Sequence, residues 1–210
     1  MSERTPPPFS VVLTGVADQP VVATARLVAA AAVHAGLDVA CSEWPVPSRG
    51  AGAVTVTVRM GEEVWSPVLA AGEADVLVAF EEIEALRAAP LLAPGGFAAV
   101  NRHLRPTWPM RAGLERAPED VLSSLLARSP HVVGVRAEAL ARRVDGSALV
   151  GLILLGVVSP VLPVPETALQ AALADGGAEG LDARRQALAR GRKLYDALPS
   201  RIAAPRQRAG

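Results

Sequence analysis

The segment SVVLTGVADQPVVATARLVAAAAVHAG, residues 10–36, decides the fold class of this chain. Residues 10–16 are an almost continuous apolar run, which predicts a central strand covered on both faces. Residues 21–35 are apolar nearly all round and predict a largely buried helix. A strand, a tight turn and a helix in this order are how an α/β domain places a helix N-terminus that can bind phosphate. The connecting turn, Gly15–Pro20, is therefore the first candidate site.

The Gly15–Pro20 turn lacks the features of a dinucleotide-binding loop. Such a loop needs glycines for the turn, for close approach to the pyrophosphate and for helix packing, and only Gly15 is present here. Pro20 removes one of the amides that would face a phosphate, and Asp18 adds a negative charge. A Walker loop is excluded, since no glycine–lysine pair occurs in the sequence. We therefore expect that this turn binds no dinucleotide.

The rest of the chain alternates strands with helices. Residues 53–60, AVTVTVRM, alternate apolar and polar side chains, which predicts a half-buried strand that forms a hairpin with residues 64–66. This order predicts an α/β fold: a mostly parallel, mixed sheet flanked by helices, Rossmann-like in type, with C-terminal helices packed on it. The predicted strands are 10–16, 37–43, 53–60, 64–66, 74–80, 97–101 and 131–135, and the predicted helices are 21–35, 81–89, 117–129, 137–143, 147–157, 166–174 and 179–197.

Length and composition favour one folded domain. The chain has 210 residues, half of them apolar, and we expect a single domain over residues 10–199 between flexible segments at 1–9 and 200–210. The formal net charge of zero gives no electrostatic reason to expect nucleic acid or an anionic membrane as a partner. The longest apolar run, residues 148–158, is too short to span a bilayer. Because residues 1–8 lack the apolar core of a signal peptide, we expect a soluble, cytoplasmic protein.

The residues that usually carry catalysis are absent or isolated. Cys41 is the only cysteine, so the chain cannot form an internal disulfide or a four-cysteine iron–sulfur site. The sequence contains no G-x-S-x-G nucleophile elbow and no H-E-x-x-H zinc motif. The three histidines lie at unrelated spacings, which favours ordinary structural roles. We therefore expect no catalytic residue and no metal ligand in this chain.

A second unusual stretch, CSEWPVPSRGAGAV, spans residues 41–54. Its polar members, Ser42, Glu43, Ser48 and Arg49, surround a loop rich in proline and glycine between two apolar strands. The loop leaves the carboxyl end of its strand, where open α/β sheets place ligands or partners. A solvated connection explains the same residues, so the chemistry of this stretch leaves both interpretations open.

Taken together, these stretches resemble the gamma-type domain of 2-oxoacid:ferredoxin oxidoreductases, and within that family the small (beta) subunit form found in indolepyruvate oxidoreductases. The resemblance covers about residues 10–195. The motifs that carry it are GVADQP at 15–20, SE at 42–43, SRGAGA at 48–53, VRMGEEVWSP at 58–67, GEADVLVAFEEIEALR at 72–87, PGGFAAVN at 94–101, LLGVVSPVLPVPETALQAAL at 154–173 and ALARGRKLY at 187–195.

The resemblance implies a fold of the type found as domain III of pyruvate:ferredoxin oxidoreductase. It also implies a non-catalytic subunit of an enzyme that oxidatively decarboxylates an indolepyruvate-like or other 2-oxoacid, passes electrons to ferredoxin and forms an acyl-CoA. Thiamine diphosphate and the iron–sulfur clusters are then held by a large partner subunit, and coenzyme A acts in the complex. The isolated chain is expected to bind none of these cofactors and to be inactive, and the expected assembly is a hetero-oligomer.

This chain departs from the family pattern at the turn. The family sequence G-x-G-G-Q-G keeps only Gly15 and Gln19 here, with Ala17, Asp18 and Pro20 at the other glycine positions. A late asparagine of the family is Gly151. The resemblance implies that the turn faces the partner subunit. The residues expected to face the partner or its active site are Gly15, Asp18, Gln19, Ser42, Glu43, Ser48, Arg49 and Glu81.

Two other functions remain open from the residues alone. The chain can be a divergent, stand-alone module that binds a small acyl or nucleotide ligand. It can also be a scaffold protein that kept the fold and lost the enzyme. Co-purification with a large subunit that carries thiamine and iron–sulfur motifs separates the first function from these two.

Overall fold

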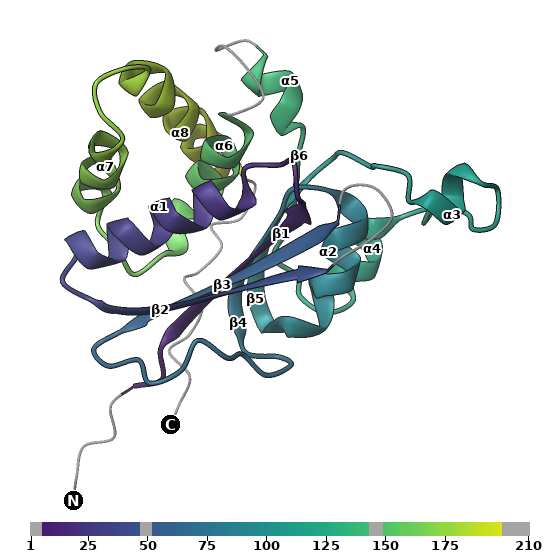
Figure 1. Ribbon diagram of the computed structural model, residues 1–210, viewed down its shortest axis with the longest axis horizontal. Helices are drawn as coiled ribbons and strands as arrows, with labels where there is room; N and C mark the ends of the chain where they lie inside the picture. Colours follow the sequence, from purple (N-terminus) through teal and green to yellow (C-terminus); the bar gives the residue numbers. More distant parts are fainter. Residues whose placement is uncertain (1–5, 47–51, 143–148, 199–210) are drawn as a thin grey trace, which may run out of the picture.

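One six-stranded sheet organises the molecule, in the order β2-β3-β1-β4-β5-β6 (Figure 1). The computed structural model describes residues 6–46, 52–142 and 149–198. β1 is parallel to β4, and β4, β5 and β6 are parallel to one another, whereas β3 is antiparallel to both β1 and β2. The predicted mixed, mostly parallel sheet is therefore confirmed. The strands are β1 (Phe9–Val16), β2 (Asp38–Val46), β3 (Ala53–Gly61), β4 (Ala74–Ala79), β5 (Leu92–Asn101) and β6 (Val132–Val135).

The predicted hairpin between β3 and residues 64–66 is wrong. β3 pairs along its whole length with β2 on one side and with β1 on the other, so neither of its edges is free. The following segment instead crosses one face of the sheet, where side chains of β3 bind its carbonyls. The Thr57 hydroxyl donates to the Pro67 carbonyl at 2.9 Å, and the Arg59 guanidinium donates to the Ser66 and Val68 carbonyls.

Helices cover the two faces of the sheet unequally. α1, α6 and α8 pack over one face and share its apolar core, whereas α2 and α4 cover the other (Figure 1). The helices are α1 (Val21–His34), α2 (Glu82–Ala88), α3 (Trp108–Arg111), α4 (Val121–Leu126), α5 (Ala137–Ala141), α6 (Val150–Val158), α7 (Glu166–Asp175) and α8 (Leu181–Asp196), with 3₁₀ turns η1 (Ala89–Leu91) and η3 (Ser159–Val161).

Two predicted boundaries are corrected by local chemistry. The helix predicted over residues 117–129 is limited to α4, because Asp120 caps it by accepting the Ser123 amide at 3.0 Å. The strand predicted to end at Glu43 continues to Val46, since β3 pairs with it up to that row. The segment between residues 101 and 117, where no helix or strand is predicted, also contains the short helix α3.

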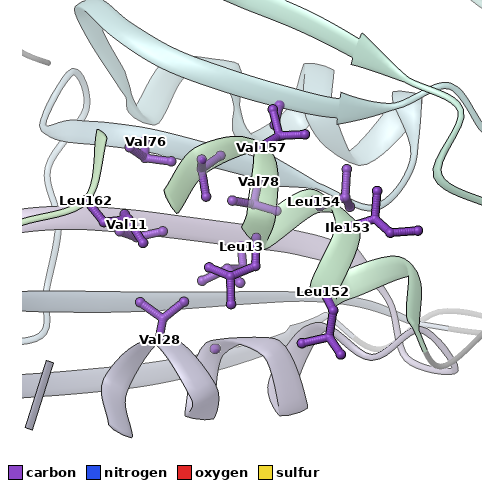
Figure 2. Packing of buried hydrophobic residues seen from close by; sticks show 14 of the residues in the cluster. Val11, Leu13, Val28, Val76, Val78, Leu152, Ile153, Leu154, Val157 and Leu162 are labelled. Carbon is purple, nitrogen blue, oxygen red and sulfur yellow. The ribbon is translucent and has the colours of Figure 1, made fainter. Parts of the chain in front are cut away.

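The core follows from the alternation of side chains along the central strands. Val11 and Leu13 point to the α1 and α6 face, and Val12 points to the α2 face. Figure 2 shows Val28 of α1 and several side chains of α6 gathered around Leu13 and the neighbouring valines of β4. Every residue of α6 is buried, so this helix is the centre of the larger core.

A glycine pair lets α8 pack directly on α6. A Cβ atom built on Gly191 would lie 2.0 Å from the carbonyl oxygen of Ile153 and 2.9 Å from the Cα of Gly156. A Cβ atom on Gly156 would lie 2.1 Å from the carbonyl oxygen of Leu188. The two helix backbones therefore touch at this crossing, which no larger residue permits.

β2 is an outer strand, and no other described strand pairs with its outward side. The Val39 amide donates to the carboxylate of the preceding Asp38 at 2.9 Å rather than to β3. Since amides alternate in direction along an antiparallel ladder, the amides of Cys41 and Glu43 also point outward. Pro45, the next outward residue, has no amide hydrogen.

The glycine pair gives a first prediction, for Gly191→Ala. Alanine is favoured over glycine inside a helix by about 1 kcal/mol. The added methyl group has no room, however, and overpacking typically costs about 1–3 kcal/mol and more when backbone must move. We expect a net loss of at least about 1 kcal/mol in the free energy of unfolding, measured by urea denaturation. Ala189→Gly, at an exposed position of the same helix, is the control. A stabilised Gly191→Ala protein would contradict the close crossing.

Candidate functional site

The candidate site lies where the chain changes direction across the sheet. α1 follows β1 on one face and leads toward β2, whereas α2 follows β4 on the other face and leads toward β5. In open α/β sheets, ligands and partners bind in the crevice at such a switch point, beyond the carboxyl ends of the strands. We call the edge where β1, β4, β5 and β6 end the carboxyl edge.

The carbonyl of Phe80 lies at the centre of this edge, directly after β4. The Gln19 side-chain amide donates to it at 3.2 Å, and the Asn101 side-chain amide donates to it at 2.9 Å. The Phe80 amide in turn donates to the Thr14 carbonyl at 2.8 Å and extends the pairing of β1 with β4. The ends of β1, β4 and β5 are therefore joined at one buried carbonyl group.

Gly15 is required by this arrangement. A Cβ atom at this position would lie 2.5 Å from the side-chain oxygen of Gln19 and 2.9 Å from the Cβ of Phe80. Any other residue would displace the Gln19 side chain that joins β1 to β4. Gly15 and Gln19 are thus the two turn residues on which this contact depends.

The amides of the turn are used within the protein. The Val16 amide donates to the Gln19 side chain at 2.9 Å, the Ala17 amide donates to the Gly52 carbonyl at 2.8 Å, and the Gln19 amide donates to the Val16 carbonyl at 2.9 Å. Pro20 has no amide hydrogen. A phosphate-binding loop directs several free amides at its ligand, and this turn directs three of its amides elsewhere.

Charged side chains of the segment Arg102–Arg105 join three elements of the carboxyl edge to one another. Arg102 pairs with Glu82 at the start of α2, with 2.6 Å between Nε and Oε1. Arg105 pairs with Asp18 of the β1–α1 turn. His103 lies next to Glu138 of α5, with 3.6 Å between Nδ1 and Oε1. Three side chains of one segment thus contact three different elements.

Asn101 orders the neighbouring part of the edge. Its side-chain oxygen accepts the Ala137 amide at 3.0 Å, and its side-chain nitrogen donates to Glu138 Oε1 at 2.8 Å. Since Asn101 is fully buried, loss of these bonds would leave unpaired polar groups in the interior. Asn101 fixes α5 against the end of β5, and it fixes Glu138 beside His103.

Glu81 is buried and caps α2. Its carboxylate accepts the Ile83 amide at 3.0 Å and the Glu84 amide at 2.6 Å. Burial raises the pKa of Glu81 above its ordinary value of 4.5, although these amides and the Arg105 amide act in the opposite direction. Burial likewise raises the pKa of Glu84, against the opposing effect of Arg87, with which Glu84 forms an ion pair. Glu81 therefore supports the edge by fixing the start of α2, and it presents no free carboxylate to a partner.

The structure brings only part of the predicted site together. Gly15, Gln19 and Glu81 lie next to Phe80, and Asp18 joins them through Arg105. The other described members are Ser42 and Glu43, and the remaining two, Ser48 and Arg49, lie outside the described residues.

Ser42 and Glu43 lie inside β2 rather than in the loop that follows it. The Ser42 hydroxyl hydrogen-bonds the Thr57 hydroxyl at 2.6 Å and accepts from the indole of Trp44, on the face crossed by residues 62–73. Glu43 is exposed and opposite Val56 of β3. β3 separates both residues from β1 and the crevice.

Sequence analysis missed Asn101, Arg105 and Glu138 as members of this edge. Asn101 belongs to the PGGFAAVN stretch and marks the end of a predicted strand, which is the signal that could have identified it. Arg105 and Glu138 are separated from their partners by long stretches of sequence, and no local spacing identifies them.

The described residues contain no group of three or more histidine, cysteine or acidic side chains arranged to hold a metal ion. Within the same described part of the chain, no helix is both long enough and apolar enough to cross a membrane. Cys41, on the outer strand β2, is an isolated thiol whose pKa is raised by burial. Cys41 lies away from the carboxyl edge, whose described side chains therefore include no thiol nucleophile. The groups that the edge offers for binding are charges and hydrogen-bonding groups.

Comparisons with known proteins agree on one family. Residues 10–194 match the family described as pyruvate ferredoxin/flavodoxin oxidoreductase. The chain is 31% identical to indolepyruvate oxidoreductase subunit IorB of Thermococcus kodakarensis, over 75% of this chain and 81% of that protein. It is 29% identical to the IorB subunit of Archaeoglobus fulgidus, over 75% of this chain and 79% of that protein.

Solved structures show the same fold. Pyruvate oxidoreductase subunit PORC of Thermotoga maritima superposes with a TM-score of 0.66 at 21% identity, over 90% of this chain and 96% of that chain. The 2-oxoglutarate:ferredoxin oxidoreductase of Magnetococcus marinus superposes with a TM-score of 0.69 at 20% identity, over 98% of this chain. This chain spans only 34% of that longer Magnetococcus chain, so there the same fold is one part of a larger polypeptide.

The buried carboxylate of Glu81 gives a second prediction. Because its pKa is raised in the folded state, the native protein binds this proton more tightly than the unfolded chain does. The stabilising contribution is complete below the unfolded value of 4.5 and is lost as the pH rises through the folded value. We expect Glu81→Gln to flatten this fall in the free energy of unfolding.

Urea denaturation of the wild type and Glu81→Gln between pH 4 and pH 7 measures the difference. The variant should gain stability relative to the wild type as the pH rises. Glu119→Gln, at an exposed position, is the control for the removal of one carboxylate. A difference between wild type and Glu81→Gln that is constant over this range would contradict the raised pKa.

Proposed function

Because the chain belongs to the pyruvate ferredoxin/flavodoxin oxidoreductase family, we propose that it is the small subunit of a thiamine-diphosphate-dependent 2-oxoacid:ferredoxin oxidoreductase. The 2-oxoacid is indolepyruvate or a similar arylpyruvate, which the enzyme decarboxylates oxidatively to an acyl-CoA. The observation that carries this proposal is the match to proteins named as the IorB subunit of indolepyruvate oxidoreductase, over three quarters of this chain. Ferredoxin accepts the electrons, and the complex works in the cytoplasm.

The residues of this chain do not fit the redox cofactors of such an enzyme. An iron–sulfur cluster needs several cysteine thiolates, and Cys41 is the only cysteine in the sequence. The described residues also contain no cluster of acidic, histidine or cysteine side chains suited to a metal ion. We therefore assign thiamine diphosphate and the iron–sulfur clusters to a large catalytic subunit, and coenzyme A to the assembled complex.

The carboxyl edge supports a role in assembly. It is built from side chains whose polar atoms are largely bonded to one another, such as Gln19 and Asn101 on the Phe80 carbonyl and Asp18 on Arg105. A preformed, polar and irregular surface of this kind suits a protein partner. The proposed partner-facing residues are those predicted from the sequence except the buried Glu81, with Glu43 on β2 and with Ser48 and Arg49 in the sequence that follows it.

Reconstitution tests the proposed function. Three samples are compared: this chain alone, a large subunit that carries thiamine-diphosphate and iron–sulfur motifs alone, and the two chains produced together. We expect indolepyruvate-dependent, coenzyme A-dependent reduction of ferredoxin or viologen dye only when both chains are present. The isolated small chain should be colourless. If the two chains do not co-purify when they are produced together, or if the isolated small chain contains stoichiometric iron, the proposal is contradicted.

Charge reversal at Glu43 tests the proposed interface. An interface charge that is reversed typically costs a few kcal/mol, because its partner is left unpaired, whereas a change at a solvated site stays within about 0.5 kcal/mol. We expect Glu43→Arg to weaken assembly with the large subunit while circular dichroism shows a folded chain. Glu63→Arg, an exposed acidic residue after the opposite end of β3, is the matched control. Assembly of Glu43→Arg at the wild-type yield would place Glu43 outside the interface.

A further inference from the structure

A short segment that projects from the carboxyl edge has a fixed shape and almost no contact with the rest of the protein. We call residues 106–117 the arm; it follows the charged segment Arg102–Arg105 and contains α3. Figure 1 shows α3 beyond α2 and α4, away from the helices on the opposite face of the sheet. Neither of the two apolar cores includes a side chain of the arm.

Hydrogen bonds within the arm hold its shape. Thr107 caps α3 by accepting the Met110 amide, and the Arg111 side chain donates to the Pro106 carbonyl at 3.2 Å. At the other end, the Leu114 amide donates to the Pro109 carbonyl at 2.9 Å and the Gly113 amide donates to the Met110 carbonyl at 3.1 Å. With Gly113 at a φ of 72°, this is the Schellman ending of a helix.

The hydrogen bonds that the structure gives to the arm join residues of the arm to one another. Its four-residue helix is therefore capped at both ends, although it is too short to be stable by its own propensity. A segment that is ordered locally and buries little of its surface is preorganised for contact with another molecule.

The arm exposes two large apolar side chains. Trp108 is 52% exposed and Leu114 is 73% exposed. Exposed tryptophans on a fixed backbone are the residues that most often dominate protein interfaces, since they fill pockets and lose little conformational entropy on binding. The surrounding residues 111–117 are all exposed, so no other described element covers this surface.

The root of the arm is fixed to the proposed interface. Arg102, His103 and Arg105 contact Glu82, Glu138 and Asp18 on three separate elements immediately before the arm begins. The Glu82 amide also donates to the His103 carbonyl at 2.9 Å. The direction of the arm is thus set by the same charged groups that form the carboxyl edge.

We propose that the arm is a docking element whose Trp108 and Leu114 side chains insert into an apolar pocket of the large catalytic subunit. This proposal rests on the proposed function, which supplies the partner. The choice of occupant follows from continuity: the arm extends the edge that we propose to face the large subunit, and its charged root lies within that edge.

The strand connection at the other end of the sheet offers a matched control. Trp65 is 86% exposed and Val68 is 60% exposed, and both lie between the end of β3 and the start of β4, opposite to the carboxyl edge. Two double variants therefore remove similar exposed apolar groups from opposite ends of the sheet. One combines Trp108→Ala with Leu114→Ala, and the other combines Trp65→Ala with Val68→Ala. Since none of these side chains belongs to a core, all variants should fold.

The experiment measures the dissociation constant of each variant chain with the large subunit, together with the molar mass of each chain alone by light scattering. We expect the Trp108 and Leu114 double variant to bind about 30-fold or more weakly, as hot-spot truncation does, and the Trp65 and Val68 variant to bind within about threefold of the wild type. Unchanged circular dichroism and urea midpoints exclude a folding defect.

Three results would overturn the proposal. Wild-type affinity of the arm variant shows that the arm does not dock on the large subunit, while the proposed function stands. A self-associated wild-type chain that becomes monomeric when the arm is changed assigns the arm to a second copy of this chain. Failure of the wild-type chain to bind the large subunit at all removes the proposed function and this proposal with it.

Discussion

The carbonyl group of Phe80 is the constraint on which the carboxyl edge depends. It ends the central strand β4 in the interior, where an unpaired carbonyl would be costly. Gln19 and Asn101 both donate to it, and each also bonds a second element: Gln19 accepts the Val16 amide, and Asn101 accepts the Ala137 amide. The need to satisfy one oxygen thus fixes the ends of three strands and the start of α5.

The same constraint explains why the turn needs Gly15 and Gln19, while its other residues lie outside this contact. Gly15 gives the Gln19 side chain its space, so a larger residue at position 15 would displace Gln19 from the Phe80 carbonyl. Asp18 and Pro20 lie outside this contact, and Asp18 bonds Arg105 at the surface. A partly exposed ion pair of this kind contributes little to stability, about 0–1 kcal/mol. A substitution at Asp18 should therefore leave the framework of the edge intact.

Sequence reasoning predicts the fold here because the central strands are apolar without interruption and the helices are separated by glycine and proline. It identifies the β1–α1 turn and Glu81 for the same reason: each lies directly after a buried strand. It fails at residues 64–66, because the pairing of β3 with β2 is set by a strand that precedes it and not by the nearby turn. The ion pairs of Arg102 and Arg105 join distant segments, and only the folded chain brings them together.

The outer strand β2 has a consequence for the life of an unassembled subunit. Its outward amides are limited to Cys41 and Glu43, because the Val39 amide is held by Asp38 and Pro45 has none. A further strand would find only two adjacent donors, which is too few to extend the sheet. Edge-to-edge pairing of two copies through β2 is therefore disfavoured. This edge of an unassembled subunit is thereby protected against the strand pairing that begins aggregation.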